Sequence, residues 1–240
     1  MTPERARQAI GLLDLTDLAD DATERAAAAL CDRAAAAGVA AVCVWPRFVA
    51  LAAGRLTDVG VRVATVVNFP SGSEPVDMVV STTRAGRDAG ADEIDVVLPY
   101  RALWGGDEAH ATAVLDRVRD ATGQGVLKVI IESGEQPDQT AVHTAAMFAL
   151  DHGADFVKTS TGKTTISATL DAAGTILGVI AAADRRVGLK VSGGIRTAAD
   201  AAAYLDLAEQ TMGEHWVSPA TFRFGASGLL DALVAAARHD

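Results

Sequence analysis

Short apolar runs alternate with longer Ala-rich segments along the whole chain. The runs have the length of β-strands, and the segments between them have the spacing of amphipathic helices, which indicates consecutive parallel βαβ units. Two helix starts carry a capping-box pattern, Asp21-x-x-Glu24 and Thr197-x-x-Asp200. The eight expected strands are Leu12–Leu15, Ala41–Trp45, Arg62–Asn68, Glu93–Leu98, Leu127–Glu132, Phe156–Ser160, Gly188–Val191 and Thr221–Phe224.

Eight units of roughly 30 residues each predict an α/β fold, a single (β/α)8 TIM barrel over residues 1–240. No linker or low-complexity stretch interrupts the pattern. An open doubly wound sheet is the alternative. Such a sheet usually carries a glycine fingerprint after its first strand, and the segment that begins at Asp14, Asp-Leu-Thr-Asp-Leu-Ala, has none.

One segment of the chain recurs. Asp88-Ala-Gly-Ala-Asp-Glu-Ile-Asp95 aligns with Asp151-His-Gly-Ala-Asp-Phe-Val-Lys158, 63 residues later. The offset corresponds to two βα units, and alternate strands of a barrel contribute side chains to the same interior layer. We therefore expect Asp95 and Lys158 to lie at one level inside the barrel. The alternative is a chance similarity of two helix–Gly–strand junctions, which would still leave two ionisable groups within apolar strands.

The chain has four lysines, Lys128, Lys158, Lys163 and Lys190, against seventeen arginines. Each lysine is therefore a candidate for chemistry that a permanently protonated guanidinium cannot do. Lys158 and Lys190 lie in consecutive expected strands, about 5 Å apart by strand spacing. Burial and like-charge proximity both lower a lysine pKa, which favours Schiff-base chemistry. A structural ion pair is the alternative for either lysine, although Asp95 could not easily neutralise both.

Glycine turns follow the last three expected strands, and they suggest a phosphate site. Active sites of barrels lie at the carboxyl ends of the strands, where the loops after strands seven and eight often bind phosphate. The alternative is that these glycines only end the strands. Lys163 and Arg196 could add positive charge to the site. We expect the phosphate to be bound by backbone N–H groups of the turns at Gly162, Gly193-Gly194 and Gly225-Ala-Ser227, with the Ser227 hydroxyl as a further donor.

Other polar residues of the expected strands carry less weight. Asp14 and Thr16 end the first strand and are secondary candidates for the site. Lys128 and Glu132 are four residues apart on one face of the fifth strand, which favours a buried ion pair between Lys128 and a carboxylate over a direct catalytic role. Cys43 lies in an apolar strand and is expected to be a small core residue.

Charge and composition limit the partners. A formal charge of −10 and a pI near 4.9 argue against nucleic acid or an anionic membrane as a general partner. No apolar run reaches spanning length, and the first ten residues are too charged for a signal peptide. Cys31 and Cys43 fit a reducing cytoplasm, and the five scattered histidines indicate no metal site. We expect a cytoplasmic protein that acts on a small molecule.

From about Asp14 to Leu230 the chain resembles the deoxyribose-phosphate aldolase family. The most specific segments are GADEIDVVLPYRAL, LKVIIESGE, GADFVKTSTGK, GLKVSGGIRT and FRFGAS. The resemblance implies that Lys158 is the Schiff-base lysine, Lys190 a second catalytic lysine, and Asp95 the aspartate of proton transfer. It also implies that the substrate phosphate is bound by Gly162, Gly194, Gly225 and Ser227.

The same resemblance implies a reaction. The family reversibly cleaves 2-deoxy-D-ribose 5-phosphate to D-glyceraldehyde 3-phosphate and acetaldehyde, in deoxyribonucleotide and carbohydrate degradation, without a metal or organic cofactor. Two rivals stay open: another barrel aldolase or transaldolase, and a barrel that binds a phosphorylated metabolite without catalysis. The sequence leaves the oligomeric state open, and a homo-oligomer is compatible with it.

Two features depart from the family pattern. Val191-Ser192 stands between Lys190 and the double glycine, where many relatives have Pro-Ala or Ala-Ser. Some relatives use a tyrosine at the C-terminus, whereas this sequence ends in Arg238-His239-Asp240 and its tyrosines are at positions 100 and 204. The resemblance therefore does not carry over a mechanism that uses a C-terminal tyrosine.

Overall fold

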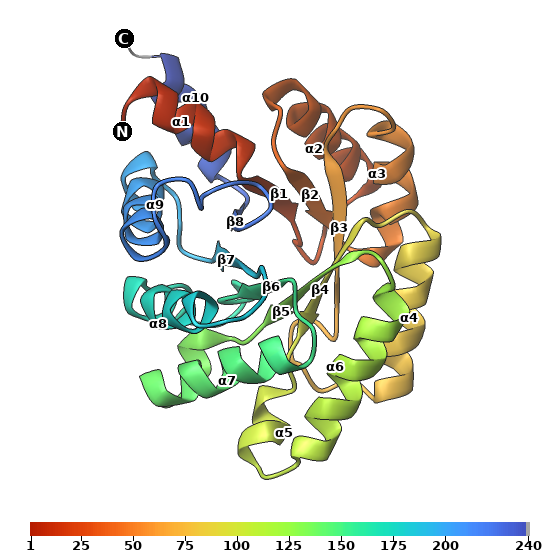
Figure 1. Ribbon diagram of the computed structural model, residues 1–240. Coiled ribbons are helices and arrows are strands. Elements are labelled where there is room, and N and C mark those ends of the chain that lie inside the picture. Colours follow the sequence, from red (N-terminus) through yellow and green to blue (C-terminus); the bar gives the residue numbers. More distant parts are fainter. Residues whose placement is uncertain (239–240) are drawn as a thin grey trace.

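The computed structural model describes residues 1–238 and is a closed barrel of eight parallel strands in sequential order (Figure 1). This confirms the predicted (β/α)8 architecture and excludes the open sheet. His239 and Asp240, which belong to the predicted tail, lie outside the described residues. The strands are β1 (Leu13–Asp17), β2 (Ala41–Val44), β3 (Arg62–Val67), β4 (Glu93–Val97), β5 (Val126–Ile130), β6 (Phe156–Lys158), β7 (Gly188–Ser192) and β8 (Phe222–Ala226).

Helices surround the barrel as an outer layer (Figure 1). The first and last helices pack side by side. The helices are α1 (Pro3–Gly11), α2 (Glu24–Ala37), α3 (Val49–Arg55), α4 (Val76–Asp88), α5 (Tyr100–Trp104), α6 (Glu108–Thr122), α7 (Gln139–Asp151), α8 (Leu170–Ala181), α9 (Ala198–Met212) and α10 (Leu229–Arg238), with short 3₁₀ turns η1 (Pro46–Phe48) and η2 (Ser133–Glu135).

Strand and helix ends differ from the predictions in a few places. β1 continues through Asp17, so Thr16 lies within the strand. β5 stops at Ile130, because Glu132 adopts a left-handed backbone with φ of 48° that no strand accommodates. The capping box at Thr197 forms, but the predicted box at Asp21 is wrong. Thr23 caps α2 instead, and its hydroxyl accepts a hydrogen bond from the amide of Ala26.

The strands separate an apolar layer from a polar interior. In β4 every residue is buried, and the alternation of side chains sends Ile94 and Val96 outward to the helices. Glu93 and Asp95 therefore point into the barrel. Burial of each large apolar side chain of the outer layer contributes about 1.5–3 kcal/mol, which offsets the cost of charges inside. Among residues 1–238, no helix has both the length and the apolar character needed to cross a membrane.

Candidate active site

Strand register brings the predicted lysines together. Lys158 on β6 pairs with Lys190 on β7, and Lys190 pairs in turn with Arg223 on β8. On the two preceding strands, Asp95 on β4 pairs with Lys128 on β5. Because paired residues of parallel strands point to the same face, all five side chains enter the barrel interior.

Asp95 lies at the centre of this arrangement. Its Oδ2 accepts hydrogen bonds from Lys158 Nζ and Lys190 Nζ, each at 2.8 Å, and its Oδ1 accepts one from Lys128 Nζ at 2.8 Å. The prediction from the repeat that Asp95 and Lys158 share one level is confirmed. The expectation that Asp95 could not easily serve two lysines is wrong for hydrogen bonding, because a carboxylate has two oxygens and each accepts more than one hydrogen bond. Its single negative charge still balances only one of them.

Two further carboxylates and an arginine complete a buried cluster of charges. Asp14 Oδ2 lies 2.6 Å from Lys190 Nζ, and Glu93 Oε2 lies 2.5 Å from Lys128 Nζ. Arg223 bridges the two carboxylates, with Nη1 at 2.5 Å from Asp14 Oδ1 and Nη2 at 3.0 Å from Glu93 Oε1. The predicted ion pair of Lys128 with a carboxylate therefore exists, with Glu93, Asp95 and Asp14 rather than with Glu132. We call the following seven side chains, all at most 4% exposed, the charge network: Asp14, Glu93, Asp95, Lys128, Lys158, Lys190 and Arg223.

The charge network divides the lysines into two kinds. Burial, reinforced by the charge of Lys190, lowers the pKa of Lys158 despite its contact with Asp95. Burial also acts against protonation of Lys190, but Asp14 and Asp95 outweigh it and raise the pKa of Lys190. Three lysines in turn hold the pKa of Asp95 well below its usual range, against the effect of burial. Lys158 is thus the amine most easily obtained in its neutral form.

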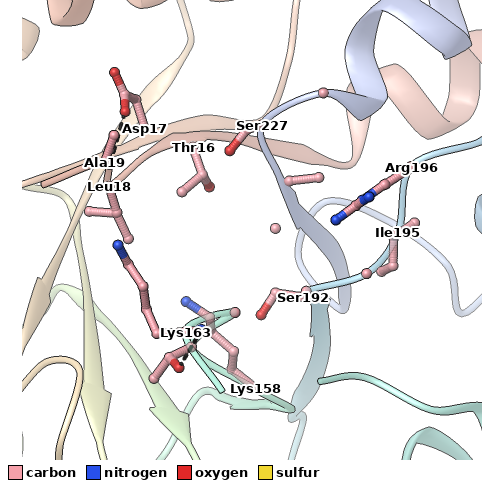
Figure 2. A pocket seen from close by; sticks show the side chains of 17 residues that line it. Thr16, Asp17, Leu18, Ala19, Lys158, Lys163, Ser192, Ile195, Arg196 and Ser227 are labelled. Carbon is pink, nitrogen blue, oxygen red and sulfur yellow. Dashed lines mark hydrogen bonds between the residues drawn. The ribbon is translucent and has the colours of Figure 1, made fainter. Parts of the chain in front are cut away.

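A cavity of about 510 Å³ opens above the charge network at the carboxyl ends of the strands. Lys158 forms part of its floor, whereas Asp95, Lys190, Asp14 and Lys128 lie beneath it. Figure 2 shows Lys158, Ser192, Ser227 and Arg196 arranged around this opening. The predicted residues that line the cavity come from the ends of β1, β6, β7 and β8: Thr16, Lys158, Gly162, Lys163, Gly194, Arg196, Gly225 and Ser227.

Two glycine positions explain how the cavity and the charge network fit together. Gly193 has a φ of 84°, and a Cβ there would come within 2.5 Å of Ser167. The turn after β7 therefore needs glycine, and it carries the Gly194 amide at the edge of the cavity. At Gly225, a Cβ would meet Lys190 Cε at 2.9 Å. Gly225 thus has a second role beside the predicted one, because it leaves room for the Lys190 side chain.

The buried carboxylate of Glu132 holds the loop after β6 in place through hydrogen bonds. Both oxygens of Glu132 lie 3.2 Å from the amide of Thr161, and Oε1 also accepts a hydrogen bond from the Thr164 hydroxyl at 3.2 Å. Burial raises the pKa of Glu132, in opposition to these hydrogen bonds. Lys163, on the same loop, reaches Asp20 Oδ1 at 3.2 Å across the cavity mouth. Glu132 therefore fixes the segment that presents Gly162 and Lys163.

Sequence reasoning missed three contributors to this site: Glu93, Arg223 and the role of Glu132. Glu93 is two residues before Asp95 and so shares its face of β4, a signal that period-2 alternation carries. Arg223 lies between two phenylalanines of an apolar strand, and a cation in that position is a signal of a buried ion pair. The role of Glu132 depends on a left-handed backbone, which the sequence pattern did not reveal.

The remaining candidate groups play other parts. Cys43 is fully buried in β2, and burial raises its pKa, so the thiol stays neutral near the lysines. Among residues 1–238, no group of three His, Cys, Asp or Glu side chains has the geometry to hold a metal ion. The donor atoms that face the cavity are instead amines, hydroxyls and backbone amides, which suit a phosphorylated carbonyl compound.

Comparisons with known proteins agree with this chemistry. A family model described as DeoC/LacD family aldolase matches residues 9–233. The deoxyribose-phosphate aldolase of Agrobacterium fabrum (strain C58 / ATCC 33970) is 48% identical over 232 residues, which cover 95% of this chain and 90% of that protein. A solved structure from Coccidioides immitis, described as a candidate deoxyribose-phosphate aldolase, has a TM-score of 0.86 at 28% identity and covers 96% of this chain and 86% of its own. The apo form of a similarly described protein from Toxoplasma gondii ME49 has a TM-score of 0.89 at 27% identity, with coverage of 98% and 97%.

Proposed function

We propose a reaction from one premise: this chain belongs to the DeoC/LacD family of aldolases. The reaction is the reversible cleavage of 2-deoxy-D-ribose 5-phosphate to D-glyceraldehyde 3-phosphate and acetaldehyde, through a Schiff base on Lys158. The name and the 48% identity of the Agrobacterium fabrum relative support this substrate. The observation that carries the proposal is the position of Lys158, which belongs both to the charge network and to the floor of the cavity.

Lys158 is proposed as the nucleophile because its amine is the least firmly protonated of the network. The neutral Nζ attacks the aldehyde carbon of the open-chain sugar, and loss of water from the carbinolamine gives an iminium ion. When a base removes the proton of the C3 hydroxyl, the electron pair of the C2–C3 bond moves into the iminium. Glyceraldehyde 3-phosphate leaves, and the two-carbon fragment remains as an enamine. Protonation of the enamine carbon and hydrolysis release acetaldehyde and restore the amine.

Asp95 and Lys190 are proposed to move the protons of these steps. Asp95 Oδ2 is 2.8 Å from both amines, so it can transfer a proton between Lys158 and Lys190 without a change in the positions of the chains. Lys190 stays protonated between Asp14 and Asp95 and is the acid of the pair. An ordered water in the cavity is proposed to reach the hydroxyl groups of the substrate.

The phosphate is proposed to bind at the cavity rim, away from the network. Gly162, Gly194, Gly225 and Ser227 surround the opening, and backbone amides with one hydroxyl hold phosphate oxygens without a buried countercharge. Arg196 and Lys163 add positive charge at the same rim. This arrangement puts the reactive aldehyde near Lys158 when the phosphate is bound at the turns. We also propose a cytoplasmic location, which the two free, buried cysteines support.

The test is an assay of the purified protein with 2-deoxy-D-ribose 5-phosphate and a panel of other sugar phosphates. We expect glyceraldehyde 3-phosphate and acetaldehyde in equal amounts from the deoxy sugar, and condensation when both products are supplied. Faster cleavage of another sugar phosphate would favour a different barrel aldolase. Binding of sugar phosphates with no product from any of them would favour the non-catalytic alternative.

A further inference from the structure

The charge network is unbalanced. Within the part of the chain that the structure describes, it holds four cationic side chains and three carboxylates. If every group were ionised, the network would carry one surplus positive charge on side chains that are at most 4% exposed. An uncompensated buried charge is costly, so the network releases one proton from the group that is held least firmly.

The contacts identify that group. Lys128 and Lys190 each lie near two or more carboxylates, and Arg223 bridges two carboxylates and cannot lose its proton at any accessible pH. Lys158 contacts one carboxylate, that of Asp95, which it shares with both other lysines. Lys158, the one amine of the network that also lines the cavity, is therefore the group from which a proton is lost most readily.

Arg223 carries the one positive charge of the network that is present at every accessible pH. It lies on β8, two strands from Lys158 and in the same register. Its guanidinium donates hydrogen bonds to the carboxylates of Asp14 and Glu93. Its Nε also donates a hydrogen bond to the carbonyl of Pro219, at the end of the barrel opposite the substrate cavity. Arg223 and Glu93 line a separate cavity of about 320 Å³ at that opposite end. Neither residue lines the cavity in which Lys158 ends.

We propose that Arg223 and Glu93 are positioning residues that set the protonation of Lys158 from the opposite end of the barrel. Arg223 forms ion pairs with Asp14 and Glu93, which are then less able to stabilise the protonated lysines. Its own positive charge also disfavours protonation of the lysines. Glu93 has the opposite effect, because its negative charge compensates the positive charges of Lys128 and Arg223. It therefore reduces the surplus positive charge of the network and favours protonation of Lys158. The proposal rests on Lys158 being the reacting amine of the proposed function.

Among residues 1–238, no ionisable group outside the network forms an ion pair with Lys128, Lys158 or Lys190. Cys43 is a neutral thiol, because burial raises its pKa. Glu132 is buried at the end of β5, where Thr161 and Thr164 hold its carboxylate. It attracts the charge of Lys158 without forming an ion pair with it, and this contribution is the same in every variant of the test. At the opposite end, Arg62 approaches Glu93 only to 3.9 Å with a side chain 57% exposed, Arg186 is exposed, and Asp155 pairs with Arg119 at 2.9 Å.

The experiment measures the lysine protons directly. With four lysines in the chain, NMR of protein labelled with [15N]lysine gives few side-chain signals, and loss of one signal in Lys158→Met assigns that of Lys158. We expect Arg223→Met, which leaves three cations and three carboxylates, to move the Lys158 titration midpoint to higher pH by about one unit. Glu93→Gln, which removes a carboxylate, should move the midpoint to lower pH. The double variant Arg223→Met/Glu93→Gln restores a surplus of one and should titrate near the parent.

Arg223→Lys is the matched control, because it keeps a cation in place and should stay close to the parent midpoint. Equal midpoints in all variants, or equal shifts in Arg223→Lys and Arg223→Met, would overturn the proposal. If Arg223→Met does not fold, the opposite shift in Glu93→Gln and its reversal in the double variant still decide the question. The titration needs no substrate, so failure of the proposed aldolase reaction in the parent would be seen separately in the turnover assay.

Discussion

The rim of the cavity and the charge network beneath it differ in nearly every physical property. At the rim, Gly162, Gly194 and Ser227 are exposed, and backbone groups are the main donors. In the network, seven charged side chains are at most 4% exposed and hold one another at 2.5–3.5 Å. A hydrated rim can bind and release an anion with little reorganisation, whereas a closed network can hold an amine in an unusual protonation state. Lys158 is where the two regions meet.

Of the substitutions that distinguish the charge network from the rim, Lys190→Leu is expected to have the largest effect on activity. Loss of a proton donor should lower kcat by about 10²- to 10⁴-fold. Because the charge of Lys190 helps to lower the pKa of Lys158, its removal should raise that pKa and reduce the neutral amine at pH 7. The residual rate should then level off at a higher pH than in the parent, as a pH series will show. Near-normal turnover with an unchanged pH profile, in a variant of normal Tm, would contradict the two-lysine account.

A rim change should affect binding instead of chemistry. Ser227→Glu places an anion where the phosphate is proposed to bind, so KM for the phosphorylated sugar should rise about 10- to 100-fold, or 1.4–2.8 kcal/mol, by loss of a charged hydrogen bond and by repulsion. Free deoxyribose should be much less affected. Ser227→Ala is the milder control. An equal loss with both sugars would mean that the phosphate binds elsewhere.

Glu132→Ala should have a smaller effect, confined to the loop after β6. It removes the acceptor for Thr161 and Thr164, each hydrogen bond being worth about 1 kcal/mol, and should raise KM for the phosphorylated sugar several-fold. Glu132→Gln retains one acceptor oxygen and should show part of the effect. Steady-state kinetics of both variants give the comparison. A shift of the pH profile without a change in KM would place Glu132 in the charge network after all.

Chelation should have the smallest effect of all. The proposed iminium on Lys158 accepts the electron pair of the broken bond, so the reaction does not require a metal for that purpose. Turnover after prolonged dialysis against a chelator should match that of untreated enzyme. Loss of activity that zinc restores would replace the Schiff-base account with a metal-dependent one.

The fold and the rim could be read from the sequence because local rules govern them. Alternating strand and helix patterns located all eight strands to within a few residues. The glycine turns that follow the strands necessarily gather at one end of a parallel barrel, and the structure places Gly162, Gly194, Gly225 and Ser227 around one cavity. The eight-residue segment that recurs 63 residues later also predicted the level shared by Asp95 and Lys158.

The charge network could be predicted only in part, because it depends on contacts between distant strands. The sequence marked Lys158, Lys190 and Asp95, but Arg223 and Glu93 lie 130 residues apart and their pairing follows from barrel closure. Contacts of this kind also decide the pKa of Lys190, which Asp14 and Asp95 raise although burial and the neighbouring lysine on β6 were expected to lower it. Propensity and spacing do not reveal which carboxylate each amine reaches.

The central claim is that Lys158 carries the covalent intermediate, and the most direct measurement is reductive trapping. The protein is treated with acetaldehyde and borohydride, and its peptides are mapped by mass spectrometry. We expect the mass of a reduced two-carbon adduct on Lys158, formed faster as pH rises toward the lowered pKa of that amine because the neutral fraction grows. Lys158→Met should gain no adduct. An adduct on Lys190 or Lys128 instead, or none in the parent, would contradict the account.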